Sequence, residues 1–97
     1  MGMEHKVEFG PRGCPKWSDV AAALAAGGFP VEMRMIDGQL AFPDETPPED
    51  WREVRVNTSG GMITIRRDAG GVTVVTWSNA DEAMRKAWDA VAEEFRS

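Results

Sequence analysis

The sequence predicts an α+β fold, a two-layer sandwich in which an antiparallel sheet of about five to six strands carries two helices on one face. Three patterns lead to this prediction. Residues 51–77 alternate apolar and polar side chains between glycine-containing turns, residues 31–42 centre on an Asp-Gly pair, and two segments repeat apolar side chains at helical spacing. The expected order is β-α-β-β-β-β-β-α, in a single domain that spans residues 1–97.

The N-terminal part is expected to contain a short strand at residues 6–9 and then a helix. Ser18 is the expected N-cap of this helix, and Asp19 lies near the positive end of its dipole. The Gly-Gly-Phe-Pro segment at residues 27–30 should end the helix after about ten residues, with Gly27 or Gly28 in the left-handed conformation. Its apolar stripe consists of Trp17, Val20, Ala21, Leu24 and Ala25.

The next element is a hairpin whose turn is the Asp37-Gly38 pair, because a type I′ turn needs positive φ at both central residues. A two-residue turn pairs Met35 with Leu40. The expected inner face holds Val31, Met33, Met35, Leu40 and Phe42, and the outer face Glu32, Arg34, Ile36, Gln39 and Ala41. Residues 43–50 follow as an acidic, proline-rich surface connector, with a recognition segment in polyproline II form as the alternative.

Three strands follow between Trp51 and Trp77. If both turns contain an even number of residues, the aliphatic side chains share one face: Val54, Val56, Ile63, Ile65, Val72 and Val74. The opposite face then collects Glu53, Arg55, Asn57, Met62, Thr64, Arg66, Thr73, Val75 and Trp77. The final helix is expected to be capped by Asn79 with Glu82 in capping-box spacing, and to pack through Ala80, Met84, Ala87, Trp88, Val91 and Phe95.

The outer sheet face is the surface that the sequence favours for binding. Trp, Met and Arg are enriched at protein interfaces, and six residues there form the candidate site: Arg34, Arg55, Met62, Arg66, Val75 and Trp77. The alternative is an ordinary solvated face, on which arginine stems cover apolar atoms and Glu53 pairs with Arg66 across the strands.

The sequence gives little support for nucleic-acid binding, membrane insertion, metal binding or a reactive thiol. The net charge of −5 opposes nucleic-acid binding, and no apolar run is long enough to cross a membrane. His5 and Cys14 are the only imidazole and thiol, so no metal site or other cofactor is expected. Cys14 lies between Arg12 and Lys16 just before a predicted helix, a setting that favours a thiolate, but no histidine base accompanies it and an inert thiol is expected.

We therefore expect a cytoplasmic binding or protein-interaction module that uses the open sheet face, with a homodimer as the simplest version and no catalysis. The alternative is a small-molecule-binding or enzymatic domain with a pocket between the C-terminal helix and the sheet, near Met33 and Trp88. The element order is similar to that of TATA-binding-protein-like and helix-grip folds, a likeness of fold that does not determine function.

Overall fold

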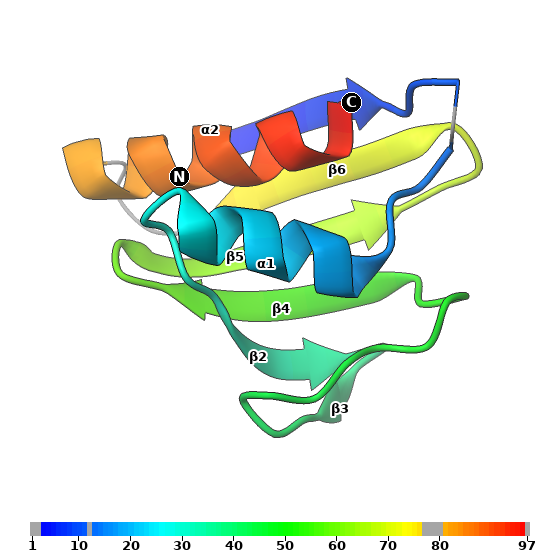
Figure 1. The fold of residues 1–97 in the computed structure, drawn as a ribbon, viewed down its shortest axis with the longest axis horizontal. Coiled ribbons are helices and arrows are strands. Elements are labelled where there is room, and N and C mark those ends of the chain that lie inside the picture. Colours follow the sequence, from blue (N-terminus) through cyan, green and yellow to red (C-terminus); the bar gives the residue numbers. More distant parts are fainter. Residues whose placement is uncertain (1–2, 12, 77–80, 97) are drawn as a thin grey trace.

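The computed structural model describes residues 3–11, 13–76 and 81–96. Both helices cover the same face of one antiparallel sheet, as Figure 1 shows, so the predicted α+β sandwich is confirmed. The strands lie in the order β1-β6-β5-β4-β2-β3. The elements are β1 (Met3–Glu8), α1 (Trp17–Ala26), β2 (Glu32–Ile36), β3 (Gln39–Leu40), β4 (Glu53–Thr58), β5 (Gly61–Arg67), β6 (Gly71–Thr76) and α2 (Glu82–Arg96).

The aliphatic face of the sheet forms the floor of the core. Val54 pairs with Ile65, and Ile65 pairs in turn with Val74, so the predicted side-chain parity is confirmed across both turns. All six predicted aliphatic residues have an exposed fraction of 0%. Each buried side chain of this size stabilises the fold by about 1.5 to 3 kcal/mol relative to an exposed one.

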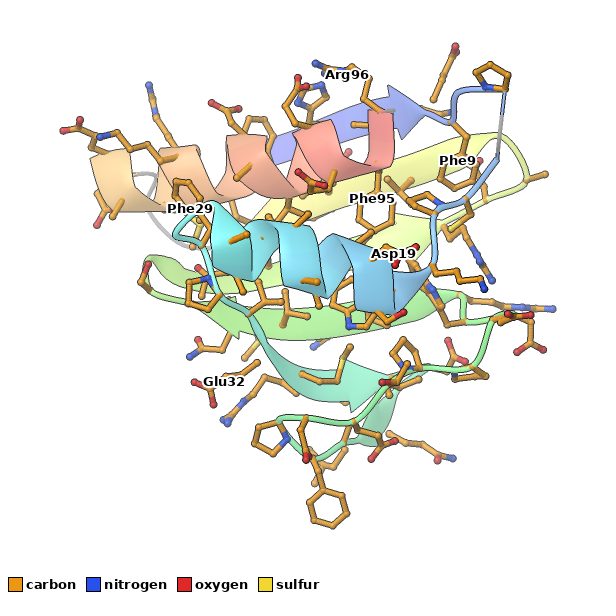
Figure 2. The ribbon with its side chains drawn as sticks, in the orientation of Figure 1. Phe9, Asp19, Phe29, Glu32, Phe95 and Arg96 are labelled. Atoms are coloured by element: carbon orange, nitrogen blue, oxygen red, sulfur yellow. The ribbon has the colours of Figure 1, made fainter. Side chains whose placement is uncertain are left out.

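The two helices cover the aliphatic face of the sheet and complete the core. Helix α1 buries Trp17, Val20 and Leu24, and Phe95 of α2 lies between the helices, with its ring centroid 6.5 Å from that of Trp17 (Figure 2). Trp88 is half-buried, and its indole N–H donates to the carbonyl oxygen of Val74 at 3.0 Å. The buried stripe of α2 comprises Met84, Ala87, Val91, Ala92 and Phe95.

The helix ends agree with the sequence prediction only in part. Helix α1 begins at Trp17, so its N-cap is Lys16 and the predicted cap Ser18 is wrong; Lys16 has no side-chain oxygen to accept a capping hydrogen bond. Its C-terminus has the predicted left-handed glycine, Gly28 with φ of +90°. In α2 the carboxylate of Asp81 accepts the N–H of Met84 at 2.8 Å, whereas Asn79 lies outside the described residues.

A β-bulge in β2 overturns the predicted faces of the hairpin. The turn itself is as predicted, with positive φ at Asp37 and Gly38 and with Met35 opposite Leu40. Met33 pairs with Val56, but Met35 pairs with the next residue back along β4, Arg55, which leaves Arg34 as the extra residue of the bulge. The hairpin side chains from Met35 to Leu40 therefore lie on the face opposite to the predicted one.

The reversal decides which hairpin residues enter the core. Ile36, predicted to face outward, is buried at 9% exposure, and Met35 moves to the face away from the helices. The expectation that Leu40 packs under the helices is wrong, because its exposed fraction is 88%; Phe42, also predicted to face inward, is 74% exposed. The pairing of residues across the turn was predicted correctly. The bulge at Arg34, earlier in β2, interrupts the alternation of faces.

The connector between β3 and β4 contains no regular structure, as predicted, but it is anchored at its end. Trp51 is only 2% exposed and contacts Trp17 and Phe95, with ring centroids 6.3 Å and 6.2 Å away. Pro47 is buried as well. The connector is therefore held against the start of α1 instead of crossing free solvent.

Gly71 marks the closest approach of β6 to β1, where a side chain has no room. An ideal Cβ at Gly71 would lie 2.0 Å from the carbonyl oxygen of Val7, whereas one at Gly70 would find its nearest neighbour at 3.9 Å. We expect Gly71→Ala to lower the free energy of unfolding by about 2 to 3 kcal/mol. Gly70→Ala should change it by less than about 0.5 kcal/mol. Urea unfolding followed by tryptophan fluorescence measures both, and equal stabilities would contradict the predicted clash.

Asp37 ties the hairpin turn to β4. Its carboxylate accepts the backbone N–H groups of Arg52 at 2.8 Å and Glu53 at 3.0 Å. The hydrogen bonds from Glu53 and then Arg52 lower the pKa of Asp37 below its ordinary value of 3.8, with smaller contributions from the charges of Arg52 and Arg67. The ionised carboxylate thus stabilises the fold above this ordinary value, and the stabilisation is lost as the pH falls through the lowered pKa.

Replacing Asp37 by asparagine tests this anchor, because asparagine tolerates positive φ and keeps an acceptor but removes the charge. We expect Asp37→Asn to lower the free energy of unfolding at neutral pH by about 1 kcal/mol or less. The difference from the wild type should shrink as the pH falls below 3.8. Denaturant unfolding across this pH range measures it, and a difference independent of pH would contradict the role of the carboxylate.

Candidate functional site

The sheet face that points away from the helices holds most of the predicted binding residues. Arg55 on β4 and Arg66 on β5 both lie on this face, and Met62 on β5 is 42% exposed. Val75 on β6 shares the face but has an exposed fraction of 0%, so it offers no surface for binding. Trp77 lies outside the described residues.

Glu53 organises the charges in the middle of this face. Its carboxylate accepts the Nε–H of Arg66 at 3.0 Å, which is the cross-strand pair expected from the sequence. Arg55 Nε lies 3.6 Å from the other carboxylate oxygen, close enough for an ion pair but too far for a hydrogen bond. This buried Nε atom has no hydrogen-bond partner in the described structure. One carboxylate therefore partly balances two guanidinium groups.

An apolar hollow lies beside these charges, toward the β3 edge. Its volume is about 330 Å³, and it is lined by Arg34, Met35, Leu40, Ala41 and Met62. The bulge in β2 brings Met35 onto this face, and Leu40 follows because the two residues pair. Leu40 and Met62 are large apolar side chains that remain 88% and 42% exposed. We call the hollow and its lining the open-face patch.

Sequence reasoning placed Arg34 and Met62 on the binding face but missed Met35 and Leu40. Both were assigned to the core because uninterrupted alternation puts them on the same side as Met33. The hairpin sequence itself carries no signal that identifies a bulge at Arg34. The register with β4 is needed to locate it.

A second concave site lies where the connector meets the start of α1. This connector cavity has a volume of about 380 Å³, within the range of small-ligand sites. Buried indoles of Trp17 and Trp51 form part of its wall, together with three prolines of the adjoining segments. The cavity is therefore at the N-terminus of α1 and not between α2 and the sheet, and Met33, expected near such a pocket, is buried in the core.

Arg67 is the principal charged group of the connector cavity. Its guanidinium carbon lies 4.7 Å from the centre of the Trp51 ring, a cation–π distance, and its Nη1 donates to the Cys14 sulfur at 3.4 Å. Among the described residues it has no ion-pair partner. Sequence reasoning missed this site because Cys14, Trp51 and Arg67 are distant in the chain.

The part of the chain that the structure describes contains neither a cluster of metal ligands nor a membrane-spanning helix. No three His, Cys, Asp or Glu side chains come together there as metal ligands would. Neither described helix is long and apolar enough to cross a membrane. Comparisons of the chain with protein-family models, with curated proteins and with solved structures give no match.

Proposed function

We propose that this chain is a small protein-interaction module whose open sheet face binds a partner, a second copy of the chain being the simplest one. The observation that carries the proposal is the open-face patch, where Leu40 and Met62 expose apolar surface around one hollow. A folded chain gains free energy when such surface is covered, at roughly 25 cal/mol per Å². Scattered apolar residues need no explanation, but a shared hollow flanked by arginines resembles an interface core with its polar rim.

The charges of the face are compatible with self-association. A two-fold symmetric dimer places the same surface against itself, so the surface must offer groups that complement each other. Arg34 is exposed and has no ion-pair partner among the described residues, and Glu32 is exposed two positions earlier in the same strand. In an antiparallel arrangement of two copies, the Arg34 of one protomer can meet the Glu32 of the other.

We place the module in the cytoplasm. Support comes from the single Cys14, which cannot form an internal disulfide and suits a reducing compartment. The net charge of −5 argues for a protein partner over a nucleic acid, because phosphate binding requires clustered positive charge.

Charging the open-face patch is the direct test. Leu40 is 88% exposed, so Leu40→Glu leaves the core intact, but it places a carboxylate in the centre of the proposed contact. We expect the dissociation constant of the homodimer to rise about tenfold or more, because truncated or charged interface anchors typically cost more than 1 kcal/mol. Arg66→Ala should weaken the association in the same direction. Sedimentation velocity over a range of concentrations measures the dimer.

A matched control is Ala23→Glu, which adds the same charge at an exposed position of α1 on the opposite side of the molecule. This variant should associate as the wild type does. Native mass spectrometry of the same preparations reports stoichiometry and any retained partner. A wild-type chain that stays monomeric at every concentration and retains no partner, or a Leu40→Glu variant that dimerises normally, would show that the proposal is wrong.

A further inference from the structure

We propose that the connector cavity binds a small organic monoanion, a carboxylate joined to a planar apolar body. The cavity lies on a different part of the molecule from the open-face patch and shares no lining residue with it. The proposal is therefore independent of the interaction surface. It rests on the shape of the cavity, on the contacts of the Arg67 guanidinium and on the charges of the residues that line the cavity.

The guanidinium of Arg67 is held in place, and no carboxylate oxygen among the described residues lies within ion-pair distance of it, although its charge also acts on the more distant Asp37. The guanidinium carbon lies over the Trp51 ring at 4.7 Å from the centroid, and the hydrogen bond from Nη1 to the Cys14 sulfur at 3.4 Å uses one of its five N–H donors. The remaining donors have no carboxylate partner among the described residues. A planar fork of this kind matches the two oxygens of a carboxylate. Because the side chain is already ordered, binding costs little further side-chain entropy.

The charges that line the cavity select a monoanion. Arg67 and Lys16 are positive, and Glu49 is the one acid among the lining residues, all of which the structure describes. One positive charge is thus in excess, although the whole chain carries a net charge of −5. A monoanion balances this excess, whereas a phosphate dianion would exceed it. At the N-terminus of α1, Asp19 in the first turn offsets the positive end of the helix dipole, so the excess charge comes from the lining side chains alone.

The walls of the cavity favour a flat apolar body behind the carboxylate. Trp17 and Trp51 line the cavity together with Pro15, Pro47 and Pro48, and these rigid side chains do not need to be ordered by a ligand. Aromatic rings pack favourably against indole edges at a small entropic cost. A volume of about 380 Å³ suits a small one-ring acid and not a large ligand.

The test uses phenylacetate and its neutral analogue phenylacetamide with the full chain. In ¹H–¹⁵N spectra, phenylacetate should shift the indole N–H signals of Trp17 and Trp51 in a saturable way, with a dissociation constant on the order of 1 mM. Phenylacetamide should bind about tenfold more weakly, because it has the same ring without the charge. This comparison uses the unchanged protein, so it does not depend on whether any variant folds.

Two neighbouring arginines provide the matched variants. Arg67→Gln should weaken phenylacetate binding about tenfold, whereas Arg66→Gln, which changes the adjacent residue on the open face, should leave it unchanged. Cys14 gives a second readout because it is the only cysteine and lines the cavity. Bound phenylacetate should slow its alkylation by iodoacetamide, measured by intact mass in each variant with and without the ligand.

The following results would overturn the proposal. These are the absence of saturable shifts at the two indoles, equal affinity for phenylacetate and phenylacetamide, and unchanged phenylacetate affinity in a folded Arg67→Gln variant. Loss of binding in Arg66→Gln would place the anion site on the open face and would also overturn it. Dimerisation is measured separately, so failure of the interaction surface and failure of the cavity are distinguishable.

Discussion

The sheet is covered by helices on one face only, and this constraint determines most of the structure. Successive side chains of a strand point to opposite faces. Of two consecutive residues in one strand, one must therefore enter the core and the other must lie on the outer face. Val54 and Val56 enter the core at 0% exposure, and Glu53 and Arg55 between and beside them are forced outward. Glu53 then lies opposite Arg66, and the central charges of the outer face follow from packing on the inner one.

Among the described strand pairings, the bulge at Arg34 is the one place where the register shifts, and it changes which side chains reach the outer face. It turns Ile36 into the core and transfers Met35 to the outer face, where Leu40 joins it at the sheet edge. Bulges are common at sheet edges, where they redirect side chains. Without the bulge, Met35 and Leu40 would lie on the helix side of the sheet, and Ile36 would lie on the outer face. The part of the apolar surface that Met35 and Leu40 contribute thus depends on one extra residue, whereas Met62 on β5 does not.

The aromatic cluster of Trp17, Trp51 and Phe95 links parts of the chain that no strand pairing connects. Ring centroids 6.2 to 6.5 Å apart bring the ends of α1, the connector and α2 together at one place. The connector cavity exists because these indoles hold the proline-rich segment against α1. Arg67 extends the cluster through its contact with Trp51, so the same packing that closes the core also positions a charged group beside a cavity.

The sequence by itself determined the features that depend on near neighbours in the chain. The Asp37-Gly38 turn, Gly28 at the end of α1 and the alternation of β4 to β6 are read from short segments because backbone dihedrals and side-chain period are local properties. Only the tertiary structure decided the bulge at Arg34, the burial of Val75 and the contact of Arg67 with Cys14, whose positions differ by 53 residues. These depend on register between strands and on packing between distant segments, and the energy that fixes them comes from contacts that no short stretch of sequence contains.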